Sequence, residues 1–451
     1  MSLIAIIYAA FISLGLPDGI LGSVWPQMSS SLYAPLAGAG VLSFITSIGT
    51  IVASFASGWL LKRLSTVGVC IGSVALTVVG LIGFAISPNF PALMVCCIPL
   101  GLGAGAIDAA LNAYVSLHFS AMHMNFLHAS WGVGAMTGPL VAGFFLNFTG
   151  QWRLTYCVIA AAQACLMLLL IVTRRTWPHE SFKTSDSVSP DVPAGTTDVT
   201  HSADVTSSSG VTNSADTTNG TGVTDEVDTT AGADSAVRAN SAAPEESGTP
   251  CNSPSDARPW YRIPLIWPTL IGFLCYCSAE GTIGLWASTF LVRYHQLAPA
   301  LAAAAGSAFY IGITAGRFSA GFASLRLTNT QLLRIGSGVL IAGMLIALLA
   351  PFPLLAVAGF ALAGIGCAPI YPAVMKETGR RLGRANVARA TGVQMGFAYL
   401  GFLFAPPATG LALTHISPLS LPIAALILAL GMTACHEYIE RRLRAETPTQ
   451  S

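Results

Sequence analysis

Residues 91–117 read PALMVCCIPLGLGAGAIDAALNAYVSL and contain a single charged residue, Asp108. A helix needs about 20 consecutive apolar residues to cross the ~30 Å hydrocarbon core of a bilayer, so this stretch predicts a membrane-spanning helix. Similar apolar runs recur on both sides of it. The sequence therefore predicts an all-α integral membrane protein with twelve spans, at 3–26, 38–61, 66–87, 91–117, 126–148, 153–173, 263–291, 300–324, 331–350, 353–376, 387–411 and 418–439.

The composition excludes an ordinary soluble protein. Of the 451 residues, 53% are hydrophobic and 9% are charged, whereas soluble domains carry about 25% charged residues. Outside residues 176–262 the acids are only Asp18, Asp108, Glu280, Glu377, Glu437, Glu440 and Glu446. A surface with so few charges fits a lipid bilayer and not water.

Net charge and cysteines point to no further partner or cofactor. The formal net charge is +1 and the basic residues are scattered in short clusters, which indicates no nucleic-acid partner. Most of the 10 cysteines lie inside apolar runs and none forms a CxxC pair. We interpret them as small apolar filler and predict neither a metal site nor a cofactor.

Basic residues in short loops mark the cytoplasmic side of a membrane protein. They follow the even-numbered spans, at Lys62, Arg63, Arg174, Arg175, Arg326, Arg334, Lys376, Arg380, Arg381, Arg384, Arg389, Arg441, Arg442 and Arg444. The opposite side carries only Arg153 and Arg293. This bias predicts a multi-pass protein of the plasma membrane with both termini in the cytoplasm.

A polar segment divides the chain into two halves. Residues 176–262 are dominated by Ser, Thr, Asp, Ala and Gly, so they cannot bury enough apolar surface to fold, and we predict a disordered cytoplasmic linker. The linker separates an N-terminal six-helix bundle, 1–175, from a C-terminal one, 263–441, which a cytoplasmic tail, 442–451, follows.

The two halves repeat one another. Gly58 and Arg63 recur 263 residues later as Gly321 and Arg326. The spacings of Gly and Pro in the fifth span recur in the eleventh, where Gly134, Pro139 and Gly143 match Gly401, Pro406 and Gly410. Such matches in equivalent spans predict parallel six-helix repeats related by an axis along the membrane normal.

Three acids fall inside predicted spans: Asp18 in GLPDGILG, Asp108 in GAGAIDAALNAY and Glu280 in CYCSAEGTIGLW. Intramembrane carboxyl groups are costly and generally face a bundle interior or a water-filled cavity. Because a low dielectric disfavours the charged form, such a group can bind and release a proton near neutral pH. We predict that all three couple transport to protons; the alternative is a carboxylate satisfied by nearby backbone or wetted at the interface.

Polar and aromatic residues near these acids are candidates for binding a solute. Asn112 lies one helical turn after Asp108, and Asn125, His128 and Trp131 lie at the start of the fifth span. Amides beside a carboxylate pair with sugar hydroxyls, and an indole can stack on the C–H face of a sugar. Alternatively, Asn112 makes an interhelical hydrogen bond, and His128 is a proton relay or a satisfied polar residue.

The second half offers its own candidates in spans that are otherwise poor in polar groups, namely Tyr276, Trp286, Tyr310, Tyr371, Gln394 and Tyr399. Among these we predict that Tyr276, Tyr371 and Gln394 contact the solute. Trp286 is a candidate for the aromatic belt at the membrane interface.

Twelve spans in two parallel repeats with a central cytoplasmic loop resemble the major facilitator superfamily. Four motifs look like the fucose–galactose–glucose proton symporter family: the run from Gly103 to Asn112, NFLH at 125–128, AEGTIGLW at 279–286 and GIGCAPIYP at 364–372. The resemblance implies the major facilitator fold. It also implies that Asp18 and Asp108 correspond to acids used in substrate binding and proton coupling, and that Asn112 and Asn125 match cavity-side amides.

The chain departs from these families at three positions. Lys62, in GWLLKR, stands where the superfamily usually has an acidic residue after the second span. Gly15 and Trp131 stand where the fucose carriers have further amides.

Together these observations predict a proton-coupled symporter of a small polar solute such as a monosaccharide, which works by alternating access as a monomer. The alternatives are a proton-coupled efflux antiporter of amphipathic compounds and a transport-dead sensor that binds partners through its linker. No catalytic constellation is present in the sequence, so we predict a carrier and not an enzyme.

Overall fold

The computed structural model describes residues 3–119, 121–177, 260–382 and 387–446. Within these ranges every regular element is a helix. The first half comprises α1 (Leu3–Asp18), α2 (Ile20–Ser31), α3 (Gly38–Arg63), α4 (Thr66–Ile86), α5 (Phe90–His118), α6 (Ala121–Thr149), α7 (Trp152–Thr173) and the 3-10 turn η1 (Arg174–Thr176). The second half comprises the 3-10 turn η3 (Trp260–Arg262), α8 (Ile266–Arg293), α9 (Pro299–Ala323), α10 (Asn329–Leu349), α11 (Pro353–Cys367), α12 (Ile370–Leu382), α13 (Val387–His415) and α14 (Ser420–Glu446).

These helices confirm the predicted all-α class. Twelve helical stretches within the described ranges are long and apolar enough to cross a membrane, which is the predicted number. The predicted linker, 176–262, lies outside the described residues except at its two ends. The predicted tail begins inside α14, which continues to Glu446.

Several helices begin where a polar side chain satisfies a free backbone N–H group. The side chain of Ser65 accepts a hydrogen bond from the Gly68 N–H at the start of α4, and Asn89 accepts one from Ala92 at the start of α5. Thr328 and Gln331 form a reciprocal capping box at the start of α10. The short polar interruptions between the apolar runs therefore fix where the spans begin.

Two predicted spans are broken helices. The first span runs from Leu3 to Ser31 in two segments, α1 and α2, with Gly19 between them. The tenth span is divided into α11 and α12, and Pro369 lies in the gap. Proline lacks a backbone N–H and weakens the preceding turn, and Pro17 in α1 has the same effect. Hydropathy predicted these spans as continuous because it does not register backbone breaks.

Four pairs of equivalent helices pack closely in both halves. In the first half, which we call the N-bundle (α1–α7), the close pairs are α1 with α6, α3 with α5, α4 with α5, and α4 with α7. In the second half, the C-bundle (α8–α14), the corresponding pairs are α8 with α13, α9 with α11, α10 with α11, and α10 with α14. This correspondence confirms the parallel six-helix repeats.

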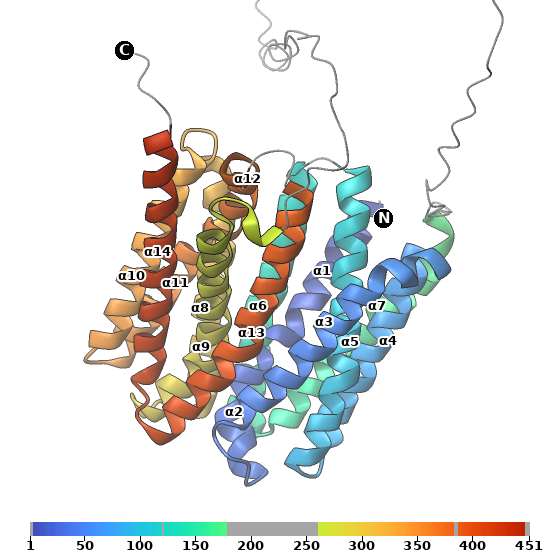
Figure 1. The fold of residues 1–451 in the computed structure, drawn as a ribbon. Coiled ribbons are helices and arrows are strands. Elements are labelled where there is room, and N and C mark those ends of the chain that lie inside the picture. The colour runs from blue at the N-terminus through green and yellow to red at the C-terminus, as the bar shows by residue number, and fades with distance from the viewer. Residues whose placement is uncertain (1–2, 120, 178–259, 383–386, 447–451) are drawn as a thin grey trace, which may run out of the picture. The chain divides into compact units, whose positions relative to one another are not determined.

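Four helix pairs account for the main contacts between the bundles: α6 with α9, α3 with α13, α2 with α8, and α2 with α9. The start of α1 and the end of α14 lie at the same end of the helices (Figure 1). We call this the proximal end and the opposite one the distal end. Successive spans run in opposite directions, so α3 and α9 both start at the distal end and finish at the proximal end. The position of a residue within its helix therefore shows how close it lies to either end.

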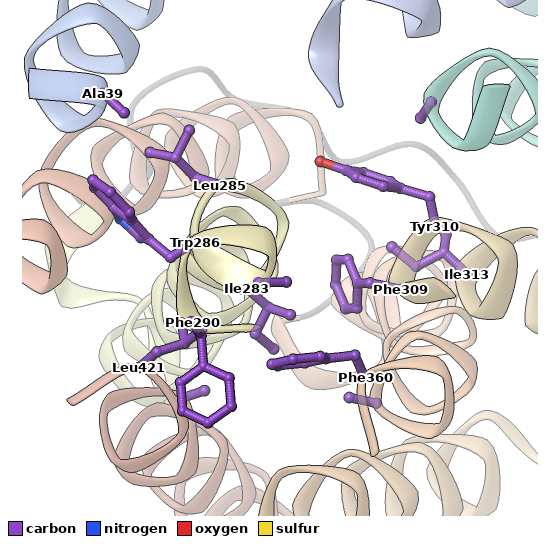
Figure 2. Packing of buried hydrophobic residues seen from close by; sticks show 14 of the residues in the cluster. Ala39, Ile283, Leu285, Trp286, Phe290, Phe309, Tyr310, Ile313, Phe360 and Leu421 are labelled. Carbon is purple, nitrogen blue, oxygen red and sulfur yellow. The ribbon is translucent and has the colours of Figure 1, made fainter. Parts of the chain in front are cut away.

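Aromatic and branched side chains fill the interior of the C-bundle. Ile283 of α8 packs with Phe309 of α9 and Phe360 of α11, and all three are buried (Figure 2). The hydroxyl of Tyr310 points away from this cluster (Figure 2). Trp286 is fully buried and its Nε1 donates a 2.8 Å hydrogen bond to the Pro406 carbonyl of α13, so its interpretation as an interfacial residue was wrong.

Two glycines bring the bundles into backbone contact near the distal end. A Cβ atom at Gly22 of α2 would collide with the carbonyl oxygen of Leu285 in α8. One at Gly40 of α3 would lie 2.7 Å from the Cα of Pro407 in α13. Only glycine permits helices to approach this closely. We call these two contacts the distal seam.

Candidate functional site

Two chambers lie between the bundles. The distal chamber has a volume of about 390 Å³ and is lined by residues of both bundles, among them Asp18, Asp108, Trp131, Glu280 and Tyr310. The proximal chamber has a volume of about 290 Å³ and reaches toward the ends of α9 and α12. The two chambers share five wall residues, which are Asp108, Trp131, Glu280, Tyr399 and Phe402.

One face of α3 supplies hydroxyl groups to the distal chamber. Ser43, Thr46, Ser47 and Thr50 line it, with the spacing of residues on a single helical face. Thr46 and Thr50 donate their hydroxyl protons to the carbonyls of Leu42 and Thr46, at 2.9 and 3.1 Å. Their oxygens remain able to accept hydrogen bonds from a solute.

Asp18 is the last residue of α1, at the break before α2, and is exposed to the distal chamber. Nε1 of Trp131 in α6 donates a 2.7 Å hydrogen bond to its Oδ2. The two helices can bring these side chains together because Gly134 packs directly against the backbone of α1 at Ile12. An indole N–H is a neutral donor, so Asp18 has a hydrogen-bond partner without a counter-charge.

Asp108 of α5 lines both chambers. Nδ2 of Asn112, one turn further on, donates to its Oδ1 and to its carbonyl oxygen, each at 3.0 Å. The amide nitrogen therefore donates both of these bonds to Asp108, and Asn112 lines neither chamber. The predicted contact of Asn112 with the solute remains a prediction, whereas its contact with Asp108 was expected from their spacing.

Glu280 of α8 has a charged partner. Its Oε1 lies 4.0 Å from Nη2 of Arg317, which belongs to α9. Arg317 also donates from Nη1 to the carbonyl oxygen of His128 in α6, at 2.8 Å. Its guanidinium group lies 5.0 Å from the ring centroid of Trp131. Arg317 thus contacts an acid in its own bundle and two residues of the other bundle.

Arg317 was not predicted from the sequence as a functional residue, although one signal was present. Arg317 is the only Lys or Arg in the predicted span 300–324, and it lies away from the span's ends. The hydroxyl face of α3 was also missed, and it was visible as Ser or Thr at positions 43, 46, 47 and 50. Two of the C-bundle tyrosines not selected as contacts, Tyr310 and Tyr399, line the distal chamber.

The remaining predicted residues divide into two groups. His128 and Tyr371 line the proximal chamber, with ring centroids 6.3 Å apart. Tyr276 and Gln394 are buried in the C-bundle and line neither chamber. Tyr276 donates to the Cys367 carbonyl at 3.2 Å, and Gln394 accepts from Thr378 at 3.0 Å. The side chain of Asn125 lies outside the described residues.

Metal ligands do not assemble at this site. Within the part of the chain that the structure describes, no three His, Cys, Asp or Glu side chains lie where they could hold a metal ion. What the site does bring together is three carboxyl groups, one guanidinium group and several aromatic rings around two adjoining chambers. Such a set can bind a solute and exchange protons with water.

Comparison with known proteins extends this description. The sequence matches the family model of the Major Facilitator Superfamily over residues 7–223 and 269–450. An uncharacterized MFS-type transporter of Yersinia pestis is 30% identical over 182 residues, which cover 39% of this chain and 47% of that protein. Two further relatives are the multidrug efflux pump SdrM of Staphylococcus aureus (25% identical, 40% of each chain) and the glucose/mannose transporter GlcP of Bacillus subtilis (22%, 34% of this chain and 38% of that one). Each match thus spans less than half of the relative.

Solved structures share the fold over almost the whole chain. The nucleoside transporter NupG superimposes with a TM-score of 0.66 at 13% identity, covering 97% of this chain and 98% of that one. The fucose:proton symporter FucP of E. coli superimposes with a TM-score of 0.56 at 16% identity, with the same coverage. At such identities the similarity establishes the fold alone.

Proposed function

The chain belongs to the Major Facilitator Superfamily, and from that premise we propose that it is a proton-coupled symporter of a small polar solute, of which a monosaccharide is the best candidate. The family and the fold are those of transporters and not of enzymes. One observation carries the proposal: Asp18 and Asp108 face the distal chamber with neutral hydrogen-bond partners.

A carboxyl group with a neutral partner can gain a proton without leaving a buried cation unpaired. Asp108 is the stronger candidate for the proton site, because it lines both chambers and can exchange protons with either. Asp18 is the second candidate. A protonated pair also removes net charge from the space between the bundles, which lowers the cost of closing the site around a solute.

Several features of the distal chamber suit a sugar. The hydroxyl face of α3 and the carboxylates offer hydrogen-bond partners, and the indole of Trp131 offers a flat apolar surface for a C–H face. Two similar proteins support this solute class by their names, the glucose/mannose transporter GlcP and the fucose:proton symporter FucP.

Transport would proceed by rocking of the N-bundle, 1–175, against the C-bundle, 263–441, with 176–262 as a cytoplasmic tether. The positions of the basic residues favour a cytoplasmic proximal end and an orientation with both termini inside the cell, in the plasma membrane. The distal seam supports a state in which the outer side is closed. Each step would require only the solute and protons, with the protein acting as a monomer.

A second candidate is a proton-coupled efflux antiporter of amphipathic cations. The charge of the distal chamber favours this candidate, since Asp18, Asp108 and Glu280 line it and no described basic residue does. Much of its remaining wall is apolar, including Leu14, Leu21, Phe84, Leu100, Ile107, Leu285 and Phe402. The similarity to the efflux pump SdrM points the same way.

One experiment separates these candidates. The purified protein is reconstituted into liposomes that contain a pH-sensitive dye, and hexoses, deoxyhexoses, disaccharides or amphipathic cations are added outside. We expect one class of sugar to drive protons inward in the unmodified protein and not in Asp108→Asn. Glu437→Gln, which alters an exposed ion pair away from both chambers, is the matched control and keeps the response.

Other outcomes have definite meanings. A proton response to amphipathic cations and to no sugar would replace the symporter with the efflux antiporter. Protein that remains folded and responds to nothing in the panel would contradict both and favour a sensor.

A further inference from the structure

We infer that Arg317 is a positioning residue that holds the two bundles together beside the central acids, and that Glu280 is its permanent counter-ion and not a proton carrier. The inference deepens the proposed function and rests on it. It assigns a role to a residue that was not predicted from the sequence.

The contacts of Arg317 with the N-bundle are the first support. Its Nη1 donates to the carbonyl oxygen of His128 at 2.8 Å, and its guanidinium group lies 5.0 Å from the ring centroid of Trp131. Both partners belong to α6, while Arg317 lies within two turns of the proximal end of α9. These contacts exist only while α6 and α9 are close together at this level. Arg317 therefore stabilises the state in which the proximal side is narrow.

The surroundings of Arg317 in its own bundle are the second support. Its side chain is 18% exposed, and among the described residues Glu280 is the only acid within 4.0 Å of it. When α6 moves away from α9, Arg317 loses both N-bundle partners. A buried guanidinium group without a counter-charge is strongly destabilising. Glu280 must therefore stay ionised in that state, and Arg317 can then move fully onto it.

Trp131 connects this contact to the acids of the N-bundle. Its ring lies against the guanidinium group of Arg317, and its Nε1 donates to Asp18. The same ring packs edge-on against Tyr310 of α9, with centroids 6.4 Å apart. A proton or solute that displaces the indole from Asp18 consequently disturbs the contact between α6 and α9. Only two direct contacts make this connection: Arg317 with the ring of Trp131, and Nε1 of Trp131 with Asp18.

The test combines charge removal with a readout of opening. Glu280→Gln, Arg317→Gln and the double variant are prepared in the full chain, each with and without Ser324→Cys, which adds a thiol to the wall of the proximal chamber. Proton-coupled uptake is measured in liposomes. Labelling of the added thiol by a membrane-impermeant maleimide is measured separately, and the background of native cysteines is subtracted by using the variants without Ser324→Cys.

We expect Glu280→Gln to lower uptake by roughly tenfold or more, because it leaves Arg317 as an unpaired cation. The double variant recovers most of that loss, since neither charge remains. Arg317→Gln raises the labelling rate about fivefold, because the hydrogen bond to α6 is lost. Arg317→Lys, which keeps the charge without the planar fork, gives an intermediate rate. Arg334→Gln, at an exposed ion pair of the same bundle, leaves labelling unchanged.

A double variant as inactive as Glu280→Gln, together with an active Arg317→Gln, would overturn the inference, because Glu280 would then be needed for itself. The inference would also be overturned if the added thiol were labelled at the same rate in Arg317→Gln as in the protein that keeps Arg317. Labelling requires neither solute nor protons. If labelling changes as expected while no solute drives proton flux, the proposed function fails and the positioning role stands.

Discussion

The two bundles give the acids between their helices different kinds of partner. In the N-bundle, Asp18 and Asp108 are hydrogen-bonded to an indole and an amide, and no described basic residue lies within 4.0 Å of either. In the C-bundle, Glu280 lies beside Arg317, and Glu440 beside Arg381. Repeats with the same helix packing thus use acids in two ways. The two acids of the N-bundle have neutral partners, whereas these two acids of the C-bundle each have an arginine beside them.

A cluster of ion pairs at the proximal end of the C-bundle completes the contrast. Arg380 of α12 bridges Glu377 of the same helix and Glu440 of α14, while Arg381 lies 3.4 Å from Glu440. Arg334 of α10 binds Glu437 through two hydrogen bonds, at 2.6 and 2.8 Å. These pairs tie α10, α12 and α14 together. Burial lowers the pKa of Arg381 below its usual value, although Glu440 opposes that effect.

The largest expected effect is on stability and tests the fixed charges. Among the described residues Glu440 is the only acid within 4.0 Å of the buried Arg381, whose side chain is 1% exposed, and Glu440→Gln removes that carboxylate. We expect the free energy of unfolding to fall by about 3 kcal/mol, because a buried cation is left without a partner. Denaturant unfolding of the purified protein in detergent measures it. Asp108→Asn serves as the contrast in the N-bundle and is expected to be no less stable than the unmodified protein. Equal losses in both variants would erase the distinction between the bundles.

The second effect tests the titrating acids. Asp108→Asn cannot carry a proton, so we expect uphill accumulation of the solute to fall about 100-fold, which corresponds to about 2.7 kcal/mol. Exchange of solute down its own gradient persists, because the amide keeps the size and the hydrogen-bonding ability of the side chain. Counterflow and accumulation are compared in the same liposomes. Accumulation that survives in Asp108→Asn would move the proton site elsewhere.

The third effect sharpens the role of the indole. Trp131→Phe keeps an aromatic ring beside Arg317 but removes the N–H group that donates to Asp18. Because hydrogen bonds to charged groups contribute about 1.5 kcal/mol or more, we expect the initial rate of uptake to fall about tenfold. Trp131→Ala, which also removes the ring, is expected to lose more. Uptake by Trp131→Phe at the unmodified rate would show that the 2.7 Å bond contributes nothing to transport.

The smallest effect belongs to the exposed pair of the C-bundle. Arg334 and Glu437 have side chains that are 43% and 33% exposed. Exposed ion pairs contribute below about 1 kcal/mol, so we expect Arg334→Gln to change the free energy of unfolding by less than that. The measurement is the same unfolding experiment in detergent. A loss comparable to that of Glu440→Gln would mean that the cluster acts as one unit and not as a set of separate pairs.

Much of this fold could be predicted from the sequence. The number of spans could be predicted because each span is a long run of apolar residues, and such a run is visible in the sequence whatever its tertiary contacts. The breaks at Gly19 and Pro369 were not predicted, because hydropathy is blind to backbone hydrogen bonding. The wrong interpretation of Trp286 has a related cause. A tryptophan near the end of a span has the same composition signal whether it lies at the interface or between helices.

The site could be predicted only in part. Asp18, Asp108 and Glu280 were selected because charge is rare in the spans, and all three line the distal chamber. Gln394 and Tyr276 were selected by the same criterion, yet both lie buried inside the C-bundle, where Oε1 of Gln394 accepts from Thr378 and the hydroxyl of Tyr276 donates to the Cys367 carbonyl. One sequence does not reveal which face of a helix points to a cavity. Arg317 was missed because its significance lies in contacts with α6, far away in the chain.

The distal seam has a consequence for the response to membrane voltage. Gly22 meets the backbone at Leu285, and Gly40 meets Pro407, so no charged side chain takes part in either contact. Parting these contacts therefore moves no charged side chain of the seam itself, and an electric field can act on the seam only through charges elsewhere in the bundles. At the level of Arg317, by contrast, a guanidinium group changes its neighbours. A change in membrane potential would therefore act through charged groups such as Arg317 and not through the contacts of the seam.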